Sequence, residues 1–127
     1  MDTGIDYTHP DLEGVVIKGH DFVNNDDDPM DDHGHGTHCA GTVGAAANGR
    51  GIVGVAHGVR ILAVKVLSKR GSGTNEQIAA GIRYAVDHGA RVISMSLGGP
   101  DSQTTREAVQ EATAKGVLCV VAAGNAN

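Results

Sequence analysis

The sequence predicts an α/β fold, a doubly wound and mostly parallel sheet with helices on both faces, present here in incomplete form. Three runs of apolar and β-branched residues, 59–67, 91–96 and 117–122, are typical of parallel strands buried on both faces. Segments with helical periodicity separate these runs, and right-handed crossovers would connect them. We expect all 127 residues to belong to one domain, since no linker or internal repeat interrupts them.

Three helices are expected around these strands. One begins after Thr74, where Thr-Asn-Glu-Gln matches a capping box, and ends at His88 and Gly89. Another covers about 104–115 and is closed by Gly116. The third covers 35–47, where small residues allow a helix to pack closely against its neighbours.

Charge and composition limit the possible partners. The net charge is −5, and ten of the fifteen acidic residues lie in the first 32 positions beside a single Lys18. This distribution argues against nucleic acid and favours a cation. No apolar run reaches the length of a membrane span, and no signal peptide precedes Met1. Cys39 and Cys119 lack metal-binding spacing and are expected to be reduced, buried thiols.

Three short motifs carry the chemistry: Asp2-Thr3-Gly4, His35-Gly36-Thr37-His38 and Gly124-Asn125. Each alone is a common turn sequence. Together they supply a carboxylate that orients an imidazole, the imidazole base and an amide that stabilises an oxyanion, which are parts of an acyl-transfer site. A catalytic Asp-Thr-Gly turn normally follows a buried strand, and because only Met1 precedes Asp2 we expect that strand to be absent from this chain.

The chain resembles the subtilases, and among them the thermitase and proteinase K branches. The resemblance implies that Asp2 and His35 are the aspartate and histidine of a catalytic triad, that Asn125 is the side-chain donor of the oxyanion hole, and that Cys39 lies beneath the histidine, where heavy metals would inhibit. The segments that carry the resemblance are 2–12, 35–42, 51–56, 94–100 and 120–125.

The resemblance also implies two walls that bind an extended peptide between them as an added strand. Their glycines have a simpler interpretation as turn residues, and this alternative stays open. The expected substrate-contacting residues are Leu67, Gly71, Ser72, Gly73, Ser96, Leu97, Gly98 and Gly99. The expected partners are polypeptide substrates, with a propeptide as a further candidate.

Calcium is the expected cofactor, and no organic cofactor is indicated. One candidate site lies in the acidic loop, although Met30 stands where the family has an oxygen ligand, and a solvated acidic loop is the alternative. The second resembles the high-affinity calcium site of many subtilases. The expected ligands are Asp21, Asn24, Asp26 and Asp28 at the first site, and Asp11, Ala46, Asn48, Arg50 and Ile52 at the second. Zinc is not expected at His33, His35 and His38, since no His-Glu-x-x-His helix is present.

The predicted function is that of a subtilisin-type serine endopeptidase, secreted and monomeric when complete. No serine within residues 1–127 has the Gly-Thr-Ser setting of the family nucleophile, so the isolated chain is expected to be inactive and prone to aggregate. The alternative is a non-catalytic, calcium-stabilised binding module derived from the same fold. A nucleophilic serine beyond Asn127 would distinguish the two.

Overall fold

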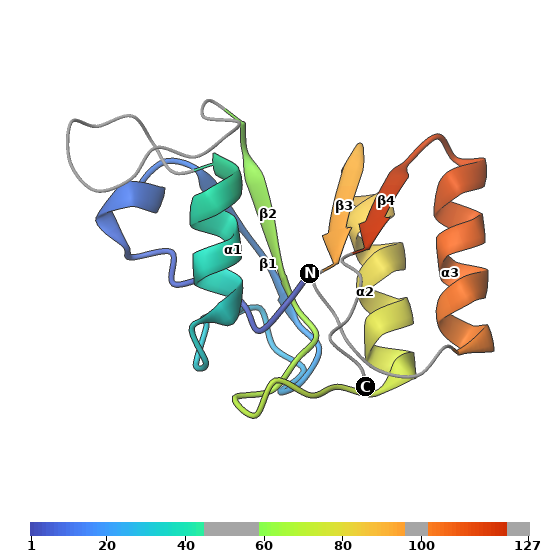
Figure 1. The fold of residues 1–127 in the computed structure, drawn as a ribbon, viewed down its shortest axis with the longest axis horizontal. Coiled ribbons are helices and arrows are strands. Elements are labelled where there is room, and N and C mark those ends of the chain that lie inside the picture. The colour runs from blue at the N-terminus through green and yellow to red at the C-terminus, as the bar shows by residue number, and fades with distance from the viewer. Residues whose placement is uncertain (45–58, 96–101, 122–127) are drawn as a thin grey trace.

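The computed structural model describes residues 1–44, 59–95 and 102–121, which form two parallel strand pairs and their covering helices (Figure 1). Pairing joins β1 to β2 and β3 to β4. No helix within the described ranges is long and apolar enough to cross a membrane. The elements in chain order are the 3-10 helix η1 (Pro10–Leu12), β1 (Val16–Asp21), α1 (His35–Gly44), β2 (Ile61–Lys65), α2 (Asn75–Asp87), β3 (Val92–Met95), α3 (Gln103–Ala114) and β4 (Leu118–Val121).

The helices begin where local capping signals are found. The hydroxyl of Thr74 accepts a hydrogen bond from the Gln77 amide, and the Gln77 side chain accepts one from the Thr74 amide, which confirms the predicted capping box. Ser102 caps α3 in a similar way through the amide of Thr105. The helix expected over 35–47 is confirmed as α1 up to Gly44, and residues 45–47 lie outside the described ranges.

Strand β2 is covered by helices on opposite faces. Ala63 packs with Ala40 of α1, whereas Val64, the next residue, packs in the cluster that contains Ile78 and Ile82 of α2. Successive side chains of a strand point to opposite faces, so this arrangement requires helices on both sides of the sheet. The predicted α/β class is therefore confirmed.

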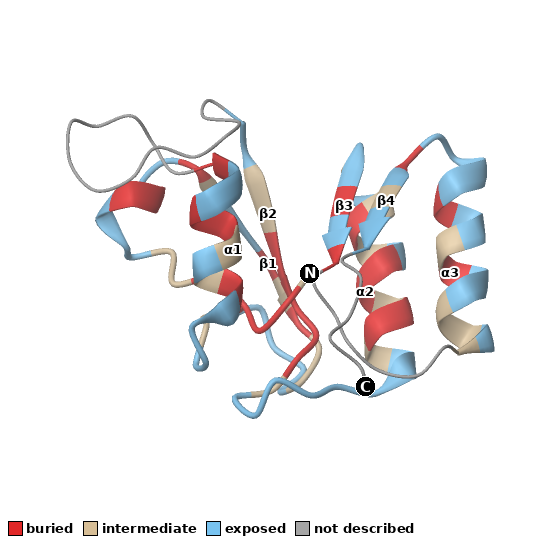
Figure 2. Ribbon diagram, viewed as in Figure 1, coloured by how far each residue is buried: buried red, intermediate tan, exposed pale blue. Residues whose placement is uncertain are grey.

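The prediction that all strands are buried on both faces is wrong for the second pair. Helices α2 and α3 cover the face that contains Ile93 and Met95. On the other face no described element covers the strands, and Val92, Leu118 and Val120 are 58%, 61% and 48% exposed (Figure 2). The sequence pattern records apolar character, but burial also depends on which elements pack against the strand.

Strand β1 was not predicted, and the other strands are shorter than the apolar runs that contain them. Lys18, Gly19 and His20 interrupt the apolar pattern of β1, whose register against β2 also shifts between Lys18 and His20. The strand forms through parallel pairing with β2 and through burial of Gly19 and Asp21. Such contacts are not visible in a local window of sequence.

The N-terminal residues lie between the two strand pairs (Figure 1). The amide of Asp2 donates to the carbonyl oxygen of Val64 at 3.2 Å, and the carbonyl oxygen of Asp2 accepts from the amide of Val66 at 2.9 Å. The terminal ammonium of Met1 donates to the carbonyl oxygen of Ser94 at 2.8 Å. The backbone that carries the Asp2 side chain is thereby fixed to both halves of the fold.

Candidate active site

The side chains of Asp2 and His35 lie in direct contact although 33 positions separate them. Nδ1 of His35 is 2.8 Å from Oδ1 and 2.9 Å from Oδ2 of Asp2. The Asp2 side chain is 9% exposed, whereas that of His35 is 46% exposed. A buried carboxylate that accepts from Nδ1 keeps the proton on that nitrogen and leaves Nε2 free to accept another.

Glycines allow the segment after Asp2 to meet the start of α1. A Cβ atom at Gly36 would overlap the carbonyl oxygen of Gly4. Gly4 itself has φ of +106°, and a Cβ atom there would overlap the carbonyl oxygen of Pro29. Because no other residue type fits these contacts without displacement of backbone, the two glycines set how closely Asp2 and His35 approach.

Asp31 organises the loop that leads into α1. Its carboxylate accepts from the amides of His33, Gly34 and Thr37 at 2.8–2.9 Å. Burial alone would raise its pKa, but the hydrogen bonds from the Thr37 side chain and these three amides outweigh it and lower the pKa of Asp31 to about 2. Asp31 is therefore ionised under all ordinary conditions.

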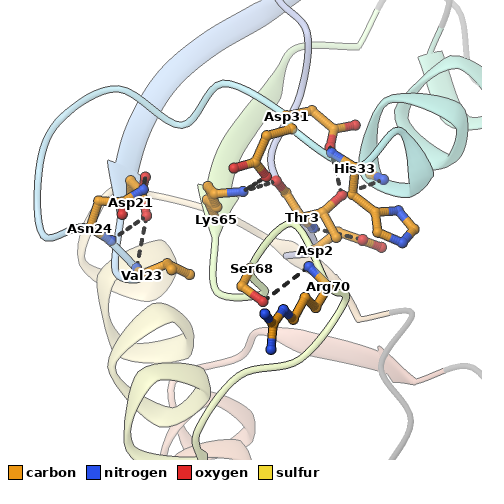
Figure 3. Close-up of polar contacts among 12 residues, drawn as sticks. Asp2, Thr3, Asp21, Val23, Asn24, Asp31, His33, Lys65, Ser68 and Arg70 are labelled. Carbon is orange, nitrogen blue, oxygen red and sulfur yellow. Dashed lines mark hydrogen bonds and ion pairs between the residues drawn. The ribbon is translucent and has the colours of Figure 1, made fainter.

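Lys65 is a buried cation beside the same loop. Its side chain is 1% exposed, and Nζ donates to the carbonyl oxygen of Thr3 at 2.5 Å and to Oδ1 of Asp32 at 2.6 Å. In Figure 3, Asp2, Thr3, Asp31 and His33 lie together next to Lys65. Sequence reasoning assigned no role to Thr3 or Lys65 and placed Asp31 only among the acidic residues of the candidate calcium loop. The one available signal for Lys65 was its position inside the mostly apolar run 59–67.

Cys39 lies one helical turn after His35, with Sγ 3.8 Å from Nε2 and 3.9 Å from Nδ1. The thiol is partly buried, and no disulfide joins it to Cys119. Among the described residues, one carboxylate oxygen, one imidazole nitrogen and one sulfur converge to within 4.8 Å of one another, from Asp2, His35 and Cys39. Burial raises the pKa of the Cys119 thiol.

His33 and His38 flank His35 but make few contacts with it. Nδ1 of His33 accepts from the amide of His35 at 3.3 Å, and the two rings lie 6.4 Å apart. His38 is exposed on α1 and lines an open hollow with Asp6 and Thr37. Their imidazoles do not join the group formed by Asp2, His35 and Cys39.

The expected peptide-binding wall is described only in part. Leu67 is 8% exposed and belongs to the hydrophobic core, so its side chain packs inward in this structure. Gly71 has φ of +77° in a turn closed by its amide and the carbonyl oxygen of Ser68, and a Cβ atom at Gly73 would overlap the carbonyl oxygen of Val66. These contacts fit the interpretation of the glycines as turn residues, and binding of a peptide at this segment stays a prediction. The carbonyl oxygen of Ser72 accepts from the Ser68 amide at 2.8 Å.

Five further residues expected at the active site, Ser96, Leu97, Gly98, Gly99 and Asn125, lie outside the described ranges.

The carboxylates of the acidic loop are already bound to neighbours. Asp21 accepts from the amides of Val23 and Asn24 and from the Asn24 side chain. In Figure 3 these three residues lie apart from Asp2 and Thr3. Asp26 accepts from the Asp28 amide at 2.9 Å. Asp28 accepts from the Tyr7 hydroxyl at 2.6 Å, which together with burial and the nearby carboxylates raises the pKa of Tyr7.

Calcium binding by this loop stays a prediction. At the second expected site Asp11 is 8% exposed within η1, and Ala46, Asn48, Arg50 and Ile52 lie outside the described residues.

Comparison with known proteins finds serine proteinases of similar sequence and structure. The chain is 57% identical to a thermophilic serine proteinase of Bacillus sp. (strain AK1) over 98% of its length and 32% of the relative. It is 52% identical to thermitase of Thermoactinomyces vulgaris, over 99% of its own length and 46% of thermitase. The solved structure of sphericase superposes with a TM-score of 0.94 at 41% identity, covering 100% of this chain and 45% of sphericase.

The chain thus spans between a third and a half of the length of these relatives. The family model for subtilases matches residues 1–127 without a gap at either end. With its Asp2–His35 contact at the junction of the two strand pairs, the chain belongs to the subtilase family.

Proposed function

We propose that this chain is part of a serine endopeptidase of the subtilisin type, in which Asp2 and His35 are two members of the catalytic triad. The observation that carries the proposal is the contact of 2.8 Å between Nδ1 of His35 and the buried carboxylate of Asp2. It fixes the tautomer that a general base requires, and the partial exposure of His35 leaves its other nitrogen accessible to a substrate.

The proposed reaction proceeds through an acyl-enzyme. Nε2 of His35 takes the proton of a serine hydroxyl while the serine oxygen attacks the peptide carbonyl carbon, and Asp2 stabilises the imidazolium. The imidazolium then gives this proton to the leaving amine, and a water molecule hydrolyses the ester by the same route in reverse order. The serine belongs to the part of the enzyme beyond this chain, as in the Asp, His, Ser order of subtilases.

Asn125 is proposed as the side-chain donor to the oxyanion. Its position three residues after the apolar run 117–122 supports this role, since polar groups at the carboxyl ends of parallel strands meet at one edge of a sheet. Removal of this donor has been studied in this same family, and we adopt the resulting factor of about 10²–10³ in kcat rather than derive it. The glycine-rich segments 71–73 and 96–99 are proposed as the walls that bind polypeptide substrate.

The test uses the full-length gene product and a chromogenic peptide with an apolar residue before the scissile bond. His35→Ala should abolish turnover, and Asn125→Ala should lower kcat by about 10²–10³ with little change in KM. His38→Ala is the matched control, because His38 is exposed on the same helix and should retain wild-type turnover. Turnover in His35→Ala equal to that of the control would contradict the proposal.

The coding sequence provides an independent test. A Gly-Thr-Ser-x-Ala segment after Asn127 would support the peptidase. Alanine or glycine in place of that serine would support the alternative, a binding module without peptidase activity.

Secretion, a monomeric state and a propeptide partner remain parts of the proposal that follow from the family.

Calcium remains a proposed structural cofactor. The acidic loop gives it little support, since its carboxylates are bound to neighbouring groups. A site formed by Asp11 and residues 46–52 is proposed from the resemblance to the calcium site of many subtilases.

A further inference from the structure

We propose that Asp31 is a positioning residue, which acts through two threonine hydroxyls to hold Asp2 and His35 at their working distance. The inference rests on the proposed peptidase function, because only there does the Asp2–His35 distance govern a reaction rate. Asp31 touches neither Asp2 nor His35. It binds instead to Thr3 and Thr37, which follow those residues in the sequence.

The two threonines bind in a reciprocal pattern. The Thr3 hydroxyl donates to Oδ1 of Asp31 at 2.8 Å and accepts from the amide of Gly36 in α1 at 2.9 Å. The Thr37 hydroxyl donates to Oδ2 of Asp31 at 2.5 Å and accepts from the amide of Asp6 at 2.8 Å. Each hydroxyl thus donates to the shared carboxylate and accepts an amide from the opposite segment. We call this arrangement of Thr3, Asp31 and Thr37 the threonine clasp.

The clasp links the segment that contains Asp2 to the start of α1 at two points. One link joins Thr3 to Gly36, directly after each catalytic residue, and the other joins Asp6 to Thr37. A hydroxyl that accepts one hydrogen bond and donates another has a fixed orientation, and a charged acceptor makes the donated bond stronger than a neutral one would. Asp31 therefore fixes both hydroxyls at once.

Other contacts around Asp31 favour a positioning role over a merely structural one. The same carboxylate accepts from the amides of His33 and Gly34, so it fixes the backbone immediately before His35 as well as the residues after it. Lys65 holds the segment that contains Asp2, since its buried ammonium binds the carbonyl oxygen of Thr3. A displacement of about 1 Å between reacting groups can lower a rate by about 10²-fold, so a loosened clasp is expected to reduce turnover without loss of the fold.

The central experiment compares Asp31→Asn with Asp32→Asn in the full-length gene product. Both remove one negative charge, and the amide oxygen introduced at position 32 can still accept from Lys65. The amide introduced at position 31 cannot serve both threonine hydroxyls and all three backbone amides as acceptor. We expect Asp31→Asn to lower kcat by about 10–100-fold with KM changed less than about 3-fold, and Asp32→Asn to stay within about 3-fold of wild type.

The threonine variants separate the clasp from the charge. Thr3→Val and Thr37→Val remove a hydroxyl without change of charge and should each lower kcat by about 10-fold, whereas Thr3→Ser and Thr37→Ser should restore it. The melting temperature of each variant is measured by circular dichroism, and turnover is assayed well below it. If Asp31→Asn does not fold, these four variants carry the test. Wild-type kcat in both valine variants would overturn the proposal.

A readout independent of turnover is the NMR chemical shift of the His35 Nδ1 proton, which lies between His35 and Asp2. A longer, weaker hydrogen bond to Asp2 should move this signal upfield in Thr3→Val and Thr37→Val, and equal chemical shifts in wild type and both variants would contradict the clasp. Failure of the function itself would appear differently. An inactive wild type with the expected chemical-shift changes would refute the peptidase and retain the geometry, whereas an active wild type with indifferent clasp variants would refute the positioning role alone.

Discussion

The sulfur of Cys39 lies 3.8 Å from Nε2 of His35, the nitrogen that the proposed mechanism uses as a base. Helical geometry causes this proximity, since residues four apart lie on the same face of α1. A thiol, an imidazole and the carboxylate of Asp2 are thereby gathered at one point. A soft metal ion bound to the sulfur would compete with the serine proton for the imidazole.

The first prediction follows from this contact. One equivalent of mercuric ion should abolish peptidase activity, because a Cys39-bound ion occupies or displaces His35. Cys39→Ser should stay active in mercury concentrations that fully inhibit the wild type. Cys119→Ser is the matched control, and it should remain as sensitive as the wild type. Equal sensitivity of the wild type and Cys39→Ser would show that inhibition occurs elsewhere.

The second prediction concerns acid stability and Asp31. Its pKa of about 2 lies below the unfolded value, so its ionised form stabilises the fold above pH 4 and this contribution is lost as the pH falls toward 2. The free energy of unfolding, measured by urea titration between pH 6 and pH 2.5, should therefore fall more steeply for the wild type than for Asp31→Asn. A serine-reactive inhibitor prevents autolysis during the measurement. Parallel pH profiles would contradict this role.

The third prediction concerns calcium. The melting temperature of the full-length protein should rise with calcium and fall with a chelator, since an ion that binds only the folded state stabilises it. Asp11→Asn should remove most of this response. Asp26→Asn should leave it largely intact, because the Asp26 carboxylate already accepts from the amide of Asp28. The opposite ranking would transfer the calcium site to the acidic loop.

The fourth prediction concerns Gly36, whose added methyl would overlap the backbone of Gly4. Gly36→Ala should destabilise the fold by about 1–3 kcal/mol, the usual cost of overpacking, and should lower kcat by separating Asp2 from His35. Gly44→Ala in the same helix is the control, since its methyl would meet only side-chain atoms of Ile61 and Val59 at 3.0–3.1 Å. A melting temperature equal to that of the control would show that the backbone can yield.

Local signals and paired motifs could be read from the sequence, whereas distant contacts could not. The capping box at Thr74 was predicted because all its partners lie within four residues. The pairing of Asp2 with His35 was expected because their motifs occur together, although each motif alone is a common turn sequence. The threonine clasp was missed, since Thr and Asp are common loop residues and their partners lie about thirty positions apart.

Burial was the other quantity that sequence alone could not supply. Leu67 was expected to contact substrate, and its side chain is buried in the hydrophobic core of this structure. The apolar pattern of β4 was correctly assigned to a strand, but its exposure depends on which elements cover it.

The uncovered face of Val92, Leu118 and Val120 has a practical consequence for anyone who prepares residues 1–127 alone. Apolar strand surface in contact with water associates with copies of itself, so the apparent molar mass from light scattering should increase with protein concentration. Unfolding midpoints of this preparation would then vary with dilution, and a single value would not describe the fold. Replacement of Leu118 and Val120 by threonine, which retains strand propensity, should make the midpoint independent of concentration.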